Sequence, residues 1–188
     1  MTCIAAVVGQ DGTVWMGGDS AGIDSDSLDL GIGKETKVWA TDGILFGACG
    51  SFRVSQVLRW HMTVPDANPK HDPLQYITGP LVDAMRNSLQ SAGALTVWEE
   101  DATESMGGGL LIAYQGRVFE MWGDFGVGEL IHDYGATGCG GPIAVGSLAT
   151  TEGLGMNPKK RVQSALEAAE RHSAGVRGPM TIIKSGKP

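Results

Sequence analysis

The chain has 188 residues, of which 42% are hydrophobic and 19% charged, so it is long and apolar enough for one domain with a core (residues 1–188) and is not a disordered chain. No apolar run reaches the roughly 20 residues that cross a bilayer, and a net charge of −7 argues against nucleic acid or an anionic membrane as partner. The three cysteines, odd in number and far apart, and a start without the features of a secretory signal predict a cytoplasmic protein with reduced thiols.

The first fifty residues are predicted to form mainly strands. The apolar run Ile4–Val8 ends at Gly9-Gln10-Asp11-Gly12, which is typical of a hairpin loop, and Thr13–Met16 returns as the second strand. Ile23–Gly33 is polar and acidic, and we expect an exposed loop there. The Asp42-Gly43 turn joins two further strands, expected at Lys37–Ala40 and Ile44–Cys49.

Helices follow in the middle of the chain. Apolar residues recur at intervals of three and four over Ser51–Met62 and Leu74–Leu89, which predicts two amphipathic helices. The Pro-containing segment Thr63–Pro73 between them and the acidic segment Asp101–Ser105 after them are expected to be loops.

The last part of the chain returns to strands before a final helix and strand. Two strands are expected at Gly109–Tyr114 and Arg117–Trp122, around a Gln115-Gly116 turn. A helix is expected over Asn157–His172, where Asn is a good N-cap and the following Pro suits the first turn. Met180–Ile183 predicts the last strand. These elements favour an antiparallel-rich, layered α+β domain, and the strands that are apolar on successive residues indicate cover on both faces.

No pattern in the sequence indicates a metal or a cofactor. The chain has no C-x-x-C and no H-x-x-x-H, which are common metal-ligand spacings. Gly107-Gly108-Gly109 is not followed by Lys and Ser or Thr, so it does not predict a phosphate-binding loop. We therefore expect no cofactor and no metal ion.

One short motif could suggest a serine hydrolase. Gly18-Asp19-Ser20-Ala21-Gly22 matches G-x-S-x-G, which requires a strand before the Ser and a helix directly after it. The residues that follow favour a loop, and the first histidine, His61, comes too late for a chymotrypsin-like order. A nucleophilic Ser20 is kept as an alternative, which predicts that Ser20→Ala abolishes activity and Thr2→Ala does not.

A second constellation is more informative. Removal of Met1 would leave Thr2 with a free α-amine, so that one residue carries both a nucleophilic hydroxyl and a base. The reference pKa of an α-amine is about 7.7–8.0, and a nearby Lys would lower it by like-charge repulsion. Asp19 ends the second strand of the hairpin and so lies near the chain start, and Lys37 opens the next strand, where Asp19 can hold it. Gly47 could offer a backbone N–H to an oxyanion.

The ordered set of these short motifs resembles the N-terminal-nucleophile hydrolases of the proteasome type, among them the proteasome β-subunits, HslV and Anbu. The resemblance extends over nearly the whole chain. The motifs that carry it are Thr2-Cys3-Ile4-Ala5-Ala6-Val7, Asp11-Gly12, Gly17-Gly18-Asp19, Lys37-Val38, Phe46-Gly47-Ala48-Cys49-Gly50 and Gly138-Cys139-Gly140-Gly141-Pro142.

The resemblance implies a four-layer αββα sandwich, assembly into rings or helical stacks, and hydrolysis of peptide bonds. It implies Thr2 as the nucleophile, Asp19 and Lys37 as its supporting pair, and Gly47 as the oxyanion donor. The partners it implies are further copies of the chain, polypeptide substrates and an ATPase unfoldase.

Two outer positions depart from the family pattern. Cys139 stands where the family usually has Ser before Gly-Gly, and His172, with Ser173 beside it, stands where the family commonly has an Asp in the C-terminal helix. Both side chains can still form hydrogen bonds, so we include Cys139 and His172 in the expected site. The alternative to an active enzyme is a catalytically inactive homologue with a structural or assembly role, in which Met1 stays attached and the Thr2 nitrogen remains in a peptide bond.

Overall fold

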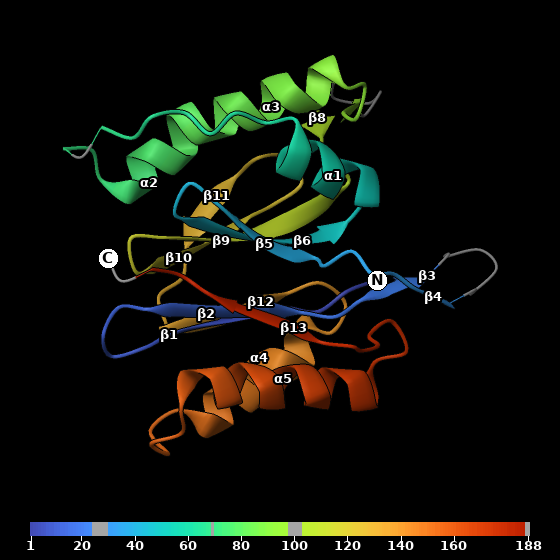
Figure 1. Cartoon of the computed structure of the whole chain (residues 1–188), viewed down its shortest axis with the longest axis vertical. Coiled ribbons are helices and arrows are strands. Elements are labelled where there is room, and N and C mark those ends of the chain that lie inside the picture. The colour runs from blue at the N-terminus through green and yellow to red at the C-terminus, as the bar shows by residue number, and fades with distance from the viewer. Residues whose placement is uncertain (24–29, 69, 98–102, 187–188) are drawn as a thin grey trace.

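The computed structural model describes residues 1–23, 30–68, 70–97 and 103–186. Two antiparallel sheets pack face to face, and helices cover the outer face of each, so that the described chain forms four layers in the order α, β, β, α (Figure 1). The predicted αββα sandwich is thereby confirmed. No helix in this part of the chain is long and apolar enough to cross a membrane.

The first sheet contains the predicted N-terminal hairpin. Ile4 lies opposite Gly18, and the loop is closed by the Gly9 N–H, which donates to the Thr13 carbonyl at 2.8 Å. Because of this register, Asp19 lies beside the start of the chain. The strands of this sheet are β1 (Ile4–Val8), β2 (Val14–Gly18), β12 (Tyr134–Thr137) and β13 (Thr181–Lys184), in the order β12-β1-β2-β13.

The second sheet contains the other two predicted hairpins. In both tight turns the two central residues have positive φ angles, 48° and 80° at Asp42 and Gly43, and 49° and 74° at Gln115 and Gly116. Two consecutive left-handed residues are what a type I′ turn requires, and this turn matches the twist of paired strands. The strands of this sheet are β5 (Val38–Thr41), β6 (Ile44–Gly50), β9 (Gly108–Tyr114), β10 (Arg117–Met121) and β11 (Val127–Glu129), in the order β11-β10-β9-β6-β5.

The helices form the two outer layers. On the second sheet lie α1 (Phe52–Trp60), α2 (Pro73–Tyr76), the π-helical segment η1 (Ile77–Leu81) and α3 (Val82–Ser91). On the first sheet lie α4 (Gly141–Thr151) and α5 (Pro158–His172). The predicted N-cap is present at α5, where the side chain of Asn157 accepts from the Lys159 N–H, and at α1 the side chain of Ser51 accepts from the Val54 N–H.

Three apolar cores lie between the four layers. The alternation of side chains along β1 divides them: Ala5 and Val7 pack toward α4 and α5, whereas Ile4 and Ala6 pack toward the second sheet. This explains why β1 is apolar at every position. Burial of each large apolar side chain contributes roughly 1.5–3 kcal/mol, so the chain start is anchored from both sides.

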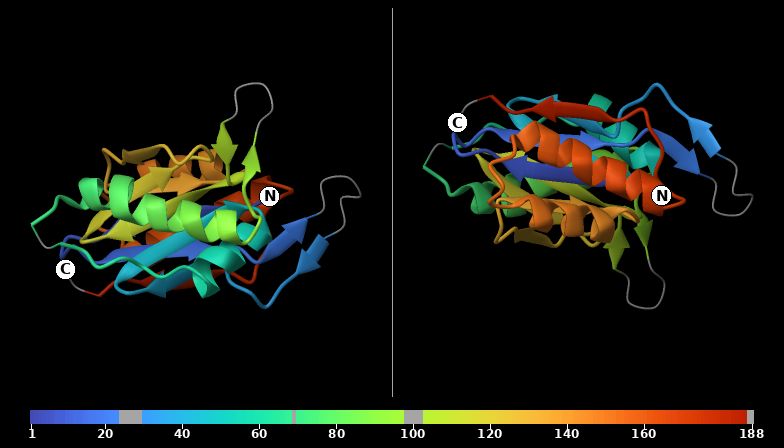
Figure 2. Two further views of the ribbon diagram at one scale, coloured as in Figure 1. Left: turned by 90° about the horizontal axis from the view of Figure 1, so that it is seen from above. Right: turned by 90° about the horizontal axis from the view of Figure 1, so that it is seen from below.

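Two short ribbons project from the end of the molecule that carries the N-terminus (Figure 2). They are β3 (Ala21–Ile23) with β4 (Leu30–Ile32), and β7 (Thr96–Val97) with β8 (Glu104–Ser105). The predictions of loops over 23–33 and 101–105 were therefore wrong at β4 and β8. Residues 24–29 and 101–102 of these two expected loops lie outside the described residues.

Besides the strands of these two ribbons, the sequence analysis missed one helix and two strands among the described residues. Helix α4 has no amphipathic stripe, since its buried residues are only Gly141, Ala144 and Leu148 and the rest are mostly small or β-branched. Strands β11 and β12 contain two glycines and few large apolar residues. These segments are ordered by the surfaces they cover rather than by local propensity.

Candidate active site

The start of the chain is fixed between the two sheets. Thr2 is only 3% exposed, and its carbonyl accepts a hydrogen bond from the Gly140 N–H at 3.1 Å. The next residue, Cys3, accepts from the Asp19 N–H at 3.3 Å through its carbonyl. The two residues before β1 are thus held by the turn before α4 and by the residue that follows β2.

Asp19 and Lys37 form a buried ion pair beside Thr2. The Lys37 ammonium donates to the two Asp19 carboxylate oxygens at 2.9 and 3.0 Å, and the side chains are 5% and 0% exposed, respectively. The carboxylate also accepts from the backbone N–H groups of Cys3 at 3.0 Å and Ala21 at 3.1 Å, and more weakly from that of Arg177 at 3.4 Å. A buried charge needs such partners, because it has lost those that water supplies.

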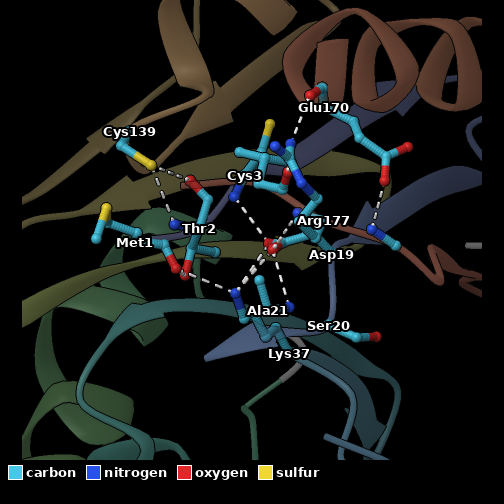
Figure 3. A network of polar contacts seen from close by, with 12 residues as sticks. Met1, Thr2, Cys3, Asp19, Ser20, Ala21, Lys37, Cys139, Glu170 and Arg177 are labelled. Atoms are coloured by element: carbon cyan, nitrogen blue, oxygen red, sulfur yellow. Dashed lines mark hydrogen bonds and ion pairs between the residues drawn. The ribbon is translucent and has the colours of Figure 1, made fainter. Parts of the chain in front are cut away.

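Lys37 also reaches the peptide bond that precedes Thr2. Its ammonium donates to the Met1 carbonyl oxygen at 3.1 Å, and the Thr2 hydroxyl donates to the same oxygen (Figure 3). The Thr2 side chain and the Asp19–Lys37 pair therefore converge on one atom. The three residues named as nucleophile and supporting pair are brought together.

Cys139 lies on the other side of Thr2. The Thr2 N–H points at the Cys139 sulfur at 3.2 Å, and this thiol lies 3.4 Å from the Thr2 carbonyl (Figure 3). The thiol also lies 3.7 Å from the Ser173 hydroxyl. The turn that carries it requires glycine, since a Cβ at Gly138, where φ is +89°, would lie 2.4 Å from the Thr2 carbonyl oxygen. The Gly-rich turn thus brings the thiol to the nitrogen of Thr2.

A small cavity of about 90 Å³ opens beside Thr2. We call it the Thr2 cavity. It is lined by the two residues at the chain start, by Lys37 before β5, and by residues of β3, β6 and α1: Met1, Thr2, Ile23, Lys37, Ala48, Gly50, Phe52 and Ser55.

Gly47 does not line this cavity. It lies within β6, opposite Val38 on one side and Leu111 on the other, and a Cβ there would lie 2.4 Å from Ile4 Cγ2 between the sheets. The next residues, Ala48 and Gly50, are in the cavity wall instead. The residues of β6 that line the cavity are therefore one and three positions after Gly47, and the role of Gly47 as oxyanion donor stays a prediction.

His172 is also not joined to this network. It is the last residue of α5 and is exposed, and within the described part of the chain no hydrogen bond or ion pair connects it to Thr2, Asp19 or Lys37. Its neighbour Ser173 is the residue that contacts Cys139.

The sequence analysis missed the segment that follows α5. Besides the contact of its N–H with Asp19, Arg177 accepts from the Ser20 N–H at 3.0 Å through its carbonyl. Its guanidinium donates to the Glu170 carbonyl at 2.9 Å, and the Glu170 carboxylate accepts from the Gly178 N–H at 2.7 Å (Figure 3). Nothing local in the sequence signals these contacts, because about 160 residues separate Arg177 from Asp19.

Among the described residues, no hydrogen bond joins the Ser20 hydroxyl to a base. This hydroxyl donates to the Pro179 carbonyl at 2.7 Å, and the residue is 5% exposed. The following residues form β3 and not the helix that a serine nucleophile of this motif requires. The geometry gives the serine-hydrolase alternative no support.

Cys3 is equally unsuited to be a nucleophile. Burial, and next the charge of Asp19, raise the pKa of its thiol to about 12. Only the thiolate is strongly nucleophilic, so Cys3 stays inert at neutral pH. In addition, no three His, Cys, Asp or Glu side chains are grouped to hold a metal ion among the residues that the structure describes.

The fold is similar to several solved structures. Over 98% of this chain and 98% of the other, it matches BPH of Thiobacillus denitrificans with a TM-score of 0.79 at 17% identity, and a second structure of BPH, in complex with epoxomicin, matches with a TM-score of 0.78. HslV from Trypanosoma brucei matches with a TM-score of 0.67 at 16% identity, over 97% of this chain and 98% of the other. Anbu from Yersinia bercovieri matches with a TM-score of 0.65 at 14% identity, over 98% of this chain and 81% of the other. Neither a protein-family model nor a curated protein matches the sequence.

Proposed function

We propose that this chain, which has the fold of the proteasome-like N-terminal-nucleophile hydrolases, is a threonine-type peptidase subunit whose nucleophile is Thr2 after removal of Met1. The observation that carries the proposal is the convergence of the Thr2 hydroxyl and the Lys37 ammonium on the Met1 carbonyl oxygen. That oxygen belongs to an acyl group bonded to the residue carrying the nucleophile, and after Met1 is removed its place is free for a substrate carbonyl.

The chemistry needs the α-amine of Thr2. With Met1 gone, the Thr2 nitrogen becomes a primary amine and takes the proton of the Thr2 hydroxyl as this hydroxyl attacks the substrate carbonyl. The tetrahedral intermediate collapses to an ester on Thr2, and the amine half of the peptide leaves with the proton. Water, deprotonated by the same amine, then hydrolyses the ester and restores the free threonine.

The neighbouring residues support each of these steps. The Lys37 ammonium, fixed by Asp19, favours the neutral form of the amine through like-charge repulsion and stabilises negative charge near the Thr2 hydroxyl. Cys139 lies within 3.2 Å of the Thr2 nitrogen and orients it. Since His172 is not connected to this group, we assign its expected supporting role to Ser173, which contacts the Cys139 thiol.

For the oxyanion we propose the Gly50 N–H in place of that of Gly47. N–H groups alternate in direction along a strand, and the Ala48 N–H donates to the Lys37 carbonyl on the β5 side at 2.9 Å. The Gly50 N–H therefore points to the same side, beyond the start of β5 at Val38 and into the wall of the Thr2 cavity.

The proposed setting is a homo-oligomer, as a ring or helical stack, in the cytoplasm. It is supported by the likeness to HslV and Anbu and by three free thiols. Polypeptides are the proposed substrates, with an ATPase unfoldase as a further partner. The main alternative is an inactive homologue with a structural or assembly role, in which Met1 stays attached and the Thr2 nitrogen remains in a peptide bond.

The test is hydrolysis of fluorogenic peptides by the assembled protein. We expect Thr2→Ala to abolish activity, Thr2→Ser to retain part of it because serine keeps a hydroxyl and an amine, and Ser20→Ala to remain active. Thr2→Ala should match the wild type in assembly and in thermal unfolding, which shows that only the chemistry is lost. An unchanged rate in Thr2→Ala, or no hydrolysis by a wild type that lacks Met1, would contradict the proposal.

A further inference from the structure

The segment that joins α5 to β13 is in direct contact with Asp19. The Arg177 N–H lies 3.4 Å from an Asp19 carboxylate oxygen. In the opposite direction, the Ser20 N–H donates to the Arg177 carbonyl at 3.0 Å, and the Ser20 hydroxyl donates to the Pro179 carbonyl at 2.7 Å. Three contacts thus tie Asp19 and Ser20 to residues 177–179.

Glu170, in the last turn of α5, holds residues 177–179 in place. Its carboxylate accepts from the Gly178 N–H at 2.7 Å, and its carbonyl accepts from the Arg177 guanidinium at 2.9 Å (Figure 3). The first of these bonds has an ionised acceptor, and such bonds are roughly twice as strong as those between neutral groups. Residues 177–179 are therefore fixed to the end of α5 by both the side chain and the backbone of Glu170.

The Glu170 carboxylate makes this contact and no ion pair within the described ranges of the chain. Glu167 of the same helix differs, because it is exposed and accepts from Gln163 of α5 itself at 2.8 Å. Helix α5 is anchored to the first sheet by four buried side chains that do not include Glu170. The hydrogen bond of Glu170 thus serves the segment beside Asp19 rather than the helix.

The position of Asp19 matters because Asp19 fixes Lys37. The two side chains form the buried ion pair described above, and the Lys37 ammonium lies at the peptide group of Thr2. A displacement of about 1 Å at a catalytic group can lower a rate on the order of 100-fold. The contacts that link Glu170 to Asp19 do not include Met1, so they do not depend on its removal.

Building on the proposed function, we infer that Glu170 is a positioning residue of the peptidase, whose carboxylate holds residues 177–179 against Asp19. Asp19 in turn fixes the Lys37 ammonium beside Thr2. Glu170 does not act on the substrate, and its effect passes through the backbone of residues 177–179. Its loss should therefore change the surroundings of the Thr2 amine as well as the rate.

The experiment measures kcat/KM for a fluorogenic peptide as a function of pH in three variants. Glu170→Ala removes the acceptor, and we expect a loss of at least ~10-fold at neutral pH. Glu170→Gln keeps an oxygen at the same reach without the charge and should keep most of the activity. Glu170→Asp keeps the charge on a side chain one methylene shorter, so it should lose activity as Glu170→Ala does.

The pH profile separates a positioning role from a structural one. The Thr2 amine must be neutral to act as a base, so kcat/KM rises as the pH passes the pKa of this amine. If the Lys37 ammonium is displaced, this pKa returns toward about 7.7–8.0 and the rise moves to higher pH. A smaller amount of folded enzyme would instead lower the rate by one factor at every pH. In the described part of the chain, the titratable side chains in contact with residues 1–3 are Asp19, Lys37 and Cys139, and Cys3 itself is titratable.

The matched control is Glu167→Ala, which removes a carboxylate from the same helix and should have the rate and pH profile of the wild type. Thermal unfolding shows which variants are folded, and Glu170→Asp provides the comparison if Glu170→Ala does not fold. If the wild type is as inactive as Thr2→Ala, the proposed peptidase function fails. If the wild type is active and Glu170→Ala matches Glu167→Ala, or loses the same factor at every pH, the role of Glu170 is overturned while the peptidase stands.

Discussion

Two clusters of charged residues in this protein have similar geometry and different surroundings. In the buried cluster, Lys37 meets Asp19 at 2.9 Å with side chains that are 5% and 0% exposed. In the exposed cluster, Arg117 donates to Asp72 at 2.7 Å and also to Glu129, with side chains between 31% and 49% exposed. Both clusters join segments far apart in the chain, yet only the first lies at the candidate active site.

The two clusters differ in the exposure of their side chains to solvent. Water and salt screen the exposed cluster, so it contributes little to stability. The buried cluster has exchanged water for fixed backbone donors to Asp19, and the loss of one partner would leave an unpaired charge in the protein interior. A short ion-pair distance alone therefore does not indicate function. It becomes informative where the pair is buried and held in place by further hydrogen bonds.

The largest effect should follow from breaking the buried cluster. Lys37→Met keeps the length of the side chain and removes its charge, so Asp19 loses its counter-ion. We expect a decrease of about 3–5 kcal/mol in the free energy of unfolding and a loss of at least ~100-fold in peptide hydrolysis. Chemical denaturation measures the free energy of unfolding, and initial rates measure peptide hydrolysis. Wild-type activity in Lys37→Met would show that the pair is structural only.

A second prediction concerns the edge of the buried cluster. Cys139 is exposed, Cys49 is half-buried and Cys3 is fully buried with a pKa raised to about 12. At pH 8 roughly one Cys3 thiol in ten thousand is ionised, so alkylation should modify Cys139 first and Cys3 last. Mass spectrometry of peptides after timed iodoacetamide treatment gives the order in which the cysteines are modified. Peptide hydrolysis should decline as Cys139 is modified. The control is Cys139→Ser, which should resist this inactivation. Early labelling of Cys3 would contradict the buried position of the site.

The smallest effect should come from the exposed cluster. Hydrogen bonding to Arg117 lowers the pKa values of Asp72 and Glu129, so both carboxylates favour the folded state where they are ionised and lose that contribution as the pH falls through the lowered values. Arg117→Gln should lower the Tm at pH 7 by less than Lys37→Met does. This small difference should shrink in high salt and below about pH 4. If Arg117→Gln lost peptide hydrolysis, or lowered the Tm by an amount that salt does not change, the proposed difference between the two clusters would be contradicted.

The comparison also explains which parts of the site could be predicted from the sequence. Thr2 and Asp19 are joined by a hairpin whose register follows from local patterning, and Lys37 precedes the next strand. Cys139 lies in a Gly-rich turn that is recognisable as a motif. The positions of these residues can therefore be predicted from local sequence patterns and from the order of the motifs along the chain.

The remaining parts depend on details that a single sequence does not contain. Whether Gly47 or Gly50 faces the cavity is decided by the direction of backbone groups, which changes at every residue of a strand. His172 ends α5 pointing to solvent, whereas the contact is made one residue later by Ser173. Arg177 reaches Asp19 only because β13 returns to pair with β2. Helix α4 has no periodic pattern that could have revealed it.

The most direct test of the central claim is the intact mass of the assembled protein, together with sequencing of its N-terminus. We predict a chain lighter than the full sequence by one methionine, with Thr2 as its first residue. A chain that retains Met1 in the assembled protein would contradict a threonine peptidase and leave the structural role.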